Sequence, residues 1–273
     1  MSIAGRFPNN GDGRMRNTSV VAVIPARLAS SRFPRKPLIK VQGLPMIEHV
    51  RRRALLCRRF SDVIVATCDL EIADVVIGNG GKVLMTSASH PGATDRVAEA
   101  ATRIDCTHVV NVQGDEILVL PADLETMVCA IENEPAIPVW NAVARLDEAD
   151  SLSDRSVVKC AISVSGRILF CARDFSRLSL KKESNFEPIR RVLGIMGYRK
   201  DFLAHYSRLS RTPLELMESI DQSRILEQDV LLRGVPFTRG YTGINEEHEV
   251  RIVQECLCQD PLQQAVLQEL LAS

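Results

Sequence analysis

The sequence lacks the features that would assign it to several common classes of protein. It has no GxxxxGK[ST] phosphate-binding loop, and no apolar run approaches the ~20 residues of a membrane-spanning helix. The N-terminus lacks the apolar core of a signal peptide. Neither sign of charge dominates, because 34 Lys and Arg residues balance 34 Asp and Glu residues. We therefore expect no Walker-type phosphate site, no membrane partner and no nucleic-acid partner.

Cysteine pairs of the kind that bind zinc are also missing, since no CxxC occurs. The eight cysteines are scattered among hydrophobic segments, and only Cys256 and Cys258 lie close together. We expect reduced, mostly buried thiols in a cytoplasmic protein and no zinc site. The remaining cysteines are Cys57, Cys68, Cys106, Cys129, Cys160 and Cys171.

A basic loop follows the first buried strand. Val20 to Ile24 is a short apolar run rich in β-branched residues, which suits a strand buried on both faces of a parallel sheet. Ligands of open α/β sheets bind beyond the carboxyl ends of such strands. Arginine and lysine side chains placed there would hold a polyphosphate, although a solvated basic loop is the plain alternative. The loop contains Ala26, Arg27, Ser30, Arg32, Arg35 and Lys36.

Strand-like and helix-like stretches alternate through the first half of the chain. We expect strands at 20–24, 62–67, 82–85 and 108–112, and helices at 45–59, 70–78, 94–104 and 121–133. This alternation predicts an α/β fold with a doubly wound, Rossmann-like, mostly parallel sheet. The arginines of the first helix (51, 52, 53, 58 and 59) are expected on a solvated face.

The second half predicts a smaller, mixed β lobe. Strands are expected at 138–145, 157–164, 168–172, 193–198 and 235–239, and helices at 200–209, 213–227 and 246–256. The helix at 213–227 is amphipathic, and its apolar face is predicted to be core or subunit interface. Residues 1–18 are expected to be a disordered extension or a misassigned start, and 261–273 a C-terminal tail.

Asp115 is the strongest single candidate for chemistry. It follows the apolar run at 108–112, so its carboxylate is expected at the carboxyl edge of the sheet, where Gly114 lets the backbone approach a ligand closely. An exposed aspartate there is otherwise an ordinary turn residue. Beside a polyphosphate loop it suits Mg²⁺, which takes one or two carboxylates together with phosphates and water.

Several ordered motifs resemble one known family, the CMP-Kdo synthetases (3-deoxy-manno-octulosonate cytidylyltransferases). They are PARLASSRFPRKPL (25–38), GLPMIEHV (43–50), DVIVAT (62–67), GATDRVAEA (92–100), VVNVQGDE (109–116), LGIMGYR (193–199) and TPLELMESIDQSRIL (212–226). The resemblance implies a cytidylyltransferase domain at 19–260, with a nucleotide half at 19–135 and an acceptor and dimerisation half at 136–245. It also implies a homodimer that uses Mg²⁺ to transfer CMP from CTP to a small acidic acceptor and releases pyrophosphate. The acceptor implied by the family is a 3-deoxy-2-keto sugar acid of the Kdo type.

The same resemblance implies roles for individual residues. Arg27, Lys36 and Asp115 would be catalytic, and Asp115 and Asn245 would hold the metal. Ala26, Arg27, Ser30, Arg32, Lys36 and Arg96 would bind the nucleotide. Gln113, Arg173, Asp221 and Gln222 would bind the acceptor. On the residues alone, Arg96 is equally well a helix-surface arginine and Arg173 a strand-end cation.

The chain departs from the family pattern in four places. Val192 and Met196 replace a histidine and a tyrosine that contact the sugar acid, and Asn245 replaces a metal-binding aspartate. Arg35 replaces a glycine and would add positive charge near the triphosphate. These changes suggest a phosphonate or another keto acid as alternative acceptors, unless Arg190, Arg191 or Tyr241 supplies the lost hydrogen bonds. A weakened, regulatory nucleotide-binding homologue is a further alternative.

Overall fold

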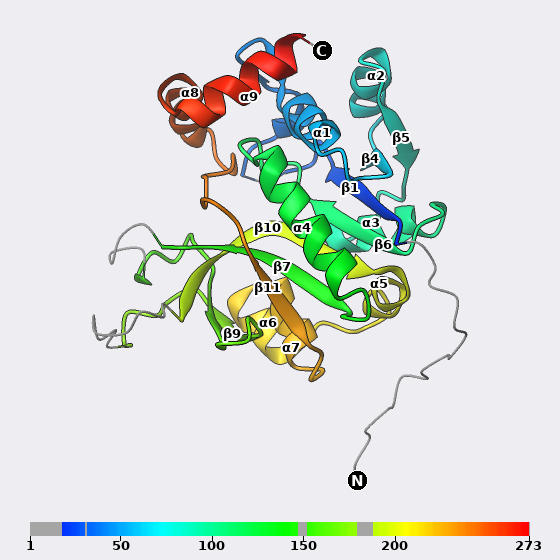
Figure 1. Cartoon of the computed structure of the whole chain (residues 1–273). Coiled ribbons are helices and arrows are strands. Elements are labelled where there is room, and N and C mark those ends of the chain that lie inside the picture. The colour runs from blue at the N-terminus through cyan, green and yellow to red at the C-terminus, as the bar shows by residue number, and fades with distance from the viewer. Residues whose placement is uncertain (1–17, 31, 147–151, 179–187, 273) are drawn as a thin grey trace.

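One nine-stranded sheet organises the protein (Figure 1). The computed structural model describes residues 18–30, 32–146, 152–178 and 188–272, so the predicted extension at 1–18 lies almost wholly outside the described residues. The strand order is β11-β7-β10-β6-β1-β4-β5, and β8 joins β10 and β9. These strands are β1 (Val20–Ala26), β4 (Asp62–Thr67), β5 (Lys82–Met85), β6 (His108–Val112), β7 (Val139–Ala144), β8 (Lys159–Ile162), β9 (Ile168–Ala172), β10 (Ile189–Arg199) and β11 (Leu232–Pro236).

Helices cover both faces of this sheet, as the doubly wound prediction requires. β1 pairs in parallel with β4 and with β6, and β4 pairs in parallel with β5. Alternate residues of β1 enter different cores: Ala22 and Ile24 pack with α1, α2 and α4, whereas Val23 packs with α3 and α5. The helices are α1 (Met46–Leu56), α2 (Leu70–Gly78), α3 (Ala93–Ala101), α4 (Pro121–Asn133) and α5 (Lys200–Tyr206).

The second half continues the same sheet. β10 lies antiparallel between β6 and β7, and β11 is parallel to β7. β8 and β9 form an antiparallel pair that branches from β10. The mixed part predicted as a lobe therefore shares the central sheet. A separate antiparallel ribbon joins β2 (Lys40–Val41) to β3 (Leu44–Pro45).

The prediction of one continuous helix at 213–227 is wrong, because the chain forms two short helices there. They are α6 (Pro213–Glu218) and α7 (Asp221–Leu226). Ser219 between them has a φ of 55°, in the left-handed region, which ends α6 and turns the chain. The predicted apolar face is consequently split: Ile220 and Ile225 are buried, but Met217 is exposed.

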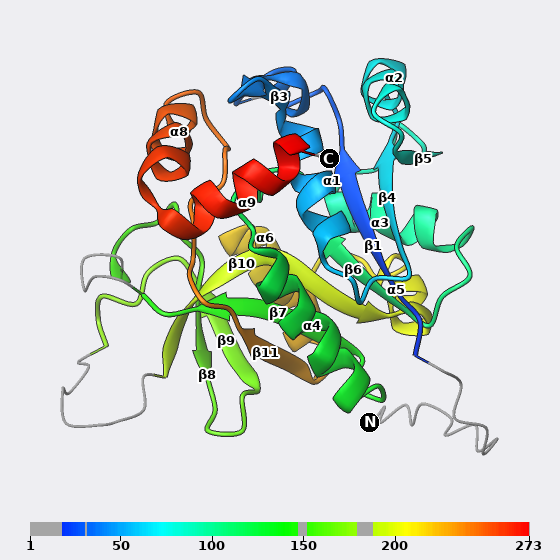
Figure 2. The same cartoon turned by 45° about the horizontal axis from the view of Figure 1, so that its top comes forward.

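The C-terminal segment forms two helices, α8 (Glu249–Gln259) and α9 (Pro261–Ala272). Residues 261–272, expected as a tail, are thus helical and pack on the side of the molecule occupied by α1 (Figure 2). Arg52 of α1 donates a hydrogen bond to the carbonyl of Leu270 at 2.8 Å. Gln263 is fully buried and donates to the carbonyl of Leu118.

The prediction that the arginines of α1 lie on a solvated face is also wrong in part, because Arg51 and Arg53 are buried. Arg51 forms a bidentate pair with the buried carboxylate of Glu48. Arg53 donates to the carbonyl of Val119, which precedes α4. These two arginines do not face solvent, because neighbouring segments cover this side of the helix.

Candidate active site

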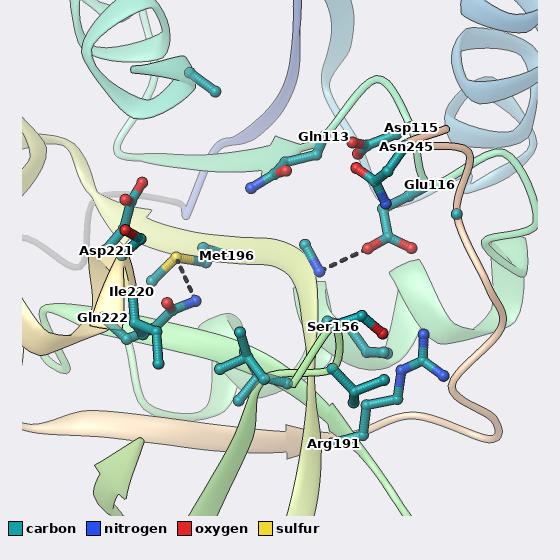
Figure 3. Close-up of a pocket in the computed structure, with 18 of the residues that line it drawn as sticks. Gln113, Asp115, Glu116, Ser156, Arg191, Met196, Ile220, Asp221, Gln222 and Asn245 are labelled. Atoms are coloured by element: carbon teal, nitrogen blue, oxygen red, sulfur yellow. Dashed lines mark hydrogen bonds between the residues drawn. The ribbon is translucent and has the colours of Figure 1, made fainter. Parts of the chain in front are cut away.

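Two adjoining cavities lie beyond the carboxyl ends of the parallel strands. The first, which we call the loop cavity, measures about 260 Å³ and is bounded by the segment after β1. The second, the strand cavity, measures about 370 Å³ and is bounded by β10 and the start of α7 (Figure 3). Ala93, Gln113, Asp115 and Asn245 line both cavities, so the two spaces meet at these four residues.

The loop cavity gathers five residues predicted to bind a nucleotide. The structure places Ala26, Arg27, Ser30, Arg32 and Lys36 on its wall. The loop is held in shape by its own hydrogen bonds, because the carbonyl of Leu28 accepts from two later amides. The Leu28 amide in turn donates to Asp69 Oδ2 at 2.8 Å, which ties the loop to the end of β4. A fixed loop carrying three cations is suited to a polyphosphate.

Arg35 does not add charge to this cavity, contrary to expectation. Its φ of 61° lies in the left-handed region, which glycine adopts more easily. The side chain is exposed and pairs with Glu71 at 2.7 Å, and it is absent from the cavity wall. The backbone at residue 35 turns the chain so that Lys36, and not Arg35, faces the site.

Asp115 lies where the two cavities meet. Its Oδ2 is 3.0 Å from Nζ of Lys36, and both side chains are mostly buried. Gly114 allows this turn to lie against β1, since a Cβ there would be 3.0 Å from the carbonyl oxygen of Pro25. The segment before α8 closes the other side, where the Ile244 amide donates to the Asp115 carbonyl at 3.2 Å.

The oxygen atoms at this junction suit a hard divalent cation. Asp115 offers a carboxylate and Asn245 an amide oxygen on the same cavity walls. Glu249 holds the Asn245 loop by accepting from the amides of Asn245 and Glu246 at 2.5 and 2.7 Å. The described residues contain no cluster of three or more His, Cys, Asp or Glu side chains arranged for a metal. This donor set fits Mg²⁺, which takes few protein ligands and completes its shell with phosphates and water.

An irregularity in β10 shapes the strand cavity. The register of β10 against β7 shifts between Val192 and Met196, and Gly194 lies inside this stretch. The Gly194 amide donates to Glu116 Oε1 at 2.6 Å, and its carbonyl accepts from the Gln113 amide at 3.1 Å. Burial raises the pKa of Glu116 to about 7, and the adjacent charge of Asp115 adds to this rise. The two hydrogen bonds to Gly194 fix Glu116 and the backbone of Gln113 on the cavity wall.

Asp221 and Gln222 lie at the other end of the strand cavity (Figure 3). The Gln222 amide donates to Asn141 Oδ1 at 2.7 Å, which fixes its orientation. Burial raises the pKa of Asp221, and Glu215 contributes to this. Val192 and Met196 line the same cavity, as expected from their positions in the motif.

Two predicted residues line neither cavity, although Arg173 contacts Ser219 of the strand-cavity wall. Arg96 belongs to α3, is buried, and donates to Thr86 Oγ1 and to the carbonyl of Ser87. Arg173 donates to the carbonyls of Glu218 and Arg155 at 2.9 and 2.8 Å, and more weakly to that of Ser219. Neither belongs to the cavity walls. Both guanidinium groups instead satisfy backbone carbonyls and a hydroxyl of neighbouring loops.

Sequence reasoning did not single out Glu116 and Ser156, and named Arg191 and Tyr241 only as possible hydrogen-bond donors. All four line the strand cavity. Glu116 carries a usable signal, since it directly follows Asp115 at the end of a buried strand. Ser156 carries none, because its place depends on how the segment before β8 folds back.

The doubly wound sheet, with a basic loop and an acidic turn at its carboxyl edge, defines the class of protein as an α/β nucleotidyltransferase. Residues 21–232 match the Cytidylyltransferase family, and the chain belongs to that family.

Known proteins similar to this chain carry a more specific name. This chain is 39% identical over 239 residues to the 3-deoxy-manno-octulosonate cytidylyltransferase of Syntrophotalea carbinolica, and the match covers 85% of this chain and 96% of that protein. The Escherichia coli protein of the same name is 35% identical, covering 79% and 87%. A solved CMP:2-keto-3-deoxy-manno-octonic acid synthetase complexed with CTP has a TM-score of 0.83 at 31% identity, covering 89% of this chain and 100% of that one.

Proposed function

We propose that this protein is a Mg²⁺-dependent cytidylyltransferase that transfers CMP from CTP to Kdo, a 3-deoxy-2-keto sugar acid, and releases pyrophosphate. The observation that carries the proposal is the meeting of two cavities at Asp115, with Lys36 Nζ 3.0 Å from its carboxylate. One cavity is basic and suits a triphosphate, while the other has a mixed polar and apolar wall that suits a sugar acid. The solved relative that binds CTP supports the nucleotide assignment.

In this reaction an acceptor hydroxyl oxygen attacks the α-phosphorus of CTP. The bond from the α-phosphorus to the oxygen that bridges it to the β-phosphorus breaks, and that oxygen leaves as part of pyrophosphate. Such transfer depends mainly on positioning and charge stabilisation. We assign Arg27, Arg32 and Lys36 to the triphosphate, with Ala26 and Ser30 adding contacts from the same loop. Lys36 would also offset the negative charge that develops on the departing pyrophosphate.

We assign the metal to Asp115 and Asn245, two residues that line both cavities and carry side-chain oxygens. When bound, Mg²⁺ neutralises phosphate charge and orients the reacting groups. Lys36 donates a hydrogen bond to the Asp115 carboxylate and balances its charge. The Asp115 side chain is therefore held in place before any ligand enters. An amide oxygen at position 245 carries no net charge, and we therefore expect weaker metal binding than with two carboxylates.

We assign the acceptor to the strand cavity, where Gln113 adjoins the metal ligands and Asp221 and Gln222 lie farther away. The relatives' names favour a Kdo-type acceptor over a small phosphonate or another keto acid. The comparisons also do not favour a regulatory homologue, and Arg27, Lys36 and Asp115 are all present on the cavity walls.

We further propose that the enzyme works in the cytoplasm as a homodimer. All eight cysteines are free thiols, which supports a reducing compartment. Within the described residues, no helix is long and apolar enough to cross a membrane. The dimer is inferred from the family resemblance, and size-exclusion chromatography with light scattering would test it.

A pyrophosphate-release assay tests the proposed reaction. Purified protein with CTP and Mg²⁺ is supplied with Kdo, a small phosphonate or no acceptor. We expect release with Kdo well above the other two conditions. Faster release with the phosphonate would reverse the acceptor assignment, and no release under any condition would favour the regulatory homologue.

A further inference from the structure

Asn141 is a fully buried polar residue on β7, the strand between β10 and β11. Its Nδ2 donates to the carbonyls of Ala142 and Leu193, each at 2.9 Å, and to that of Ile195 at 3.3 Å. The last two carbonyls belong to the stretch of β10 where the register against β7 shifts. A buried amide costs free energy unless its polar atoms are paired. The irregularity in β10 therefore supplies carbonyls that hold the Asn141 side chain.

These carbonyls determine which way the Asn141 amide faces. If the amide were turned over, its oxygen would lie against three carbonyl oxygens, none of which can donate a hydrogen bond. Oδ1 therefore points to the other side, where it accepts from Gln222 Nε2 at 2.7 Å. Gln222 must present its nitrogen here, because its own oxygen would repel Asn141 Oδ1. The backbone of β10 thus sets the orientation of a side chain on the cavity wall.

Met196 occupies the second N–H of Gln222. Its Sδ lies 3.7 Å from Gln222 Nε2 and accepts the weak hydrogen bond drawn in Figure 3. The same sulfur accepts from the hydroxyl of Tyr198 at 3.1 Å, which holds it in place. Both hydrogens of Gln222 Nε2 are thereby directed at protein atoms. Gln222 Oε1 remains for a ligand, since no group of the described residues donates to it.

Asp221 places a carboxylate beside this oxygen. We call this region the far end of the strand cavity; it lies away from the proposed metal ligands and consists of Met196, Ile220, Asp221 and Gln222 (Figure 3). Burial and the nearby charge of Glu215 raise the pKa of Asp221, and no donor in the described part of the chain is bonded to its carboxylate. With Asp221 ionised, these four side chains offer oxygen atoms as hydrogen-bond acceptors and no free N–H or O–H group.

We propose that Asn141 is a positioning residue that makes the far end select sugar acids by their hydrogen-bond donors. It acts through Gln222, whose oxygen it leaves for the ligand. The groups recognised are hydroxyl or ammonium groups of the sugar acid, on the part remote from the attacking hydroxyl. This rests on the proposed function, because it concerns the other end of the same substrate. A fluorine atom in that place would meet two oxygens without offering a donor, so such an acid should be rejected.

The test measures kcat/KM for Kdo and for analogues in which one hydroxyl at a time, other than the reacting one, is replaced by fluorine or by an amine. Fluorine donates no hydrogen bond, whereas a protonated amine donates three. In wild type we expect one position at which fluorine lowers kcat/KM by at least about tenfold and the amine does not. Better use of the amine than of Kdo would identify an ammonium as the preferred group, and equal use would identify a hydroxyl.

Two variants assign this selectivity to the far end. The ratio of kcat/KM for Kdo to that for the rejected fluorinated analogue is compared in wild type, Gln222→Ala and Asn141→Leu. The ratio should fall below about threefold in both variants, while KM for CTP stays within about threefold of wild type. A general loss of stability would lower both kcat/KM values and leave their ratio unchanged. A folded Asn141→Leu protein with the wild-type ratio would overturn the role of Asn141.

Gln222→Glu keeps the test decisive if Asn141→Leu does not fold. In the present orientation this variant would place a carboxylate oxygen 2.7 Å from Asn141 Oδ1, so kcat/KM for Kdo should fall by at least about tenfold. Unchanged use of Kdo by Gln222→Glu would overturn the proposal. If wild type uses no Kdo, the proposed function and this inference fail together. If wild type uses Kdo and every fluorinated analogue equally well, only this inference fails.

Discussion

Lys36 Nζ lies 3.0 Å from Asp115 Oδ2, which brings together a loop after β1 and a turn after β6 that are 79 positions apart in the sequence. β1 and β6 are neighbouring parallel strands, so their carboxyl ends meet at one edge of the sheet. The ion pair is therefore a direct consequence of the topology, and it places a cation beside the proposed metal ligand.

Replacing Lys36 by alanine should impair the use of CTP in both binding and turnover. A cation that contacts the phosphates acts in the ground state and in the transition state, so KM for CTP should rise and kcat should fall. We expect kcat/KM to drop by more than tenfold, which corresponds to about 1.4 kcal/mol.

Arg35→Ala is the matched control, because Arg35 is the next residue but pairs with Glu71 outside the cavity. Its kinetic constants for CTP should stay within about threefold of wild type. Steady-state kinetics on the two variants checks this, and equal effects would show that only the general charge of the loop matters.

Replacing Asn245 by aspartate should strengthen metal binding. A second carboxylate would add a charged oxygen ligand at the junction of the two cavities, and Mg²⁺ favours such ligands. We expect the Mg²⁺ concentration for half-maximal activity to fall several-fold. Glu247→Gln, in an exposed neighbour that lines neither cavity, should leave it unchanged, and a Mg²⁺ response in Asn245→Asp identical to wild type would remove Asn245 from the metal site.

Gly114→Ala should damage the site and the fold together. The new Cβ would lie 3.0 Å from the carbonyl oxygen of Pro25, a backbone atom that is fixed in β1. Separating the two strand ends would displace Asp115, so activity and melting temperature should both fall. Gly78→Ala is the control: nothing lies within 4 Å of its Cβ, and this helical site should gain up to about 1 kcal/mol. Normal activity in Gly114→Ala would show that the close approach is not required.

Stability should decrease below pH 6.5 because of His49. Burial lowers the pKa of this histidine to about 4, and its Nε2 lies 2.7 Å from the carbonyl oxygen of Val41. The unfolded chain binds a proton near pH 6.5 that the folded chain accepts only near pH 4. The free energy of unfolding is therefore lost as pH falls through this window, by at most about 1.4 kcal/mol per unit from this group.

Denaturant unfolding of wild type and His49→Gln between pH 7 and pH 4.5 checks this. The variant keeps an N–H donor for Val41 but removes the titrating group, so its stability should depend less steeply on pH. Parallel pH profiles for the two proteins would contradict the assignment to His49.

The sequence predicted best what depends on short contiguous patterns. Strand β4 was bounded correctly at 62–67 because a buried apolar run ends in polar residues on both sides. The five loop-cavity residues lie within eleven positions of one another, so one loop carries them to one place. Asp115 was located because a buried strand leads directly into it.

Features that depend on long-range contacts were not predictable. The break at Ser219 needs a left-handed residue that serine does not signal, and Arg173 folds onto the carbonyls that this break exposes. Arg51 looks like a surface residue in sequence but is buried with Glu48. Glu116 acquires its raised pKa from burial in the cavity wall, where it accepts from an amide 78 positions away.

³¹P NMR can follow directly whether CMP moves from CTP to Kdo at the Asp115 junction. Purified enzyme, CTP, MgCl₂ and Kdo should yield pyrophosphate and one new phosphodiester resonance in equal amounts. Asp115→Asn, with a melting temperature near that of wild type, should form less than a tenth of both products, a loss exceeding about 1.4 kcal/mol. Absence of the phosphodiester with wild type would rule out CMP transfer to Kdo, and its undiminished formation with Asp115→Asn would rule out the role of Asp115.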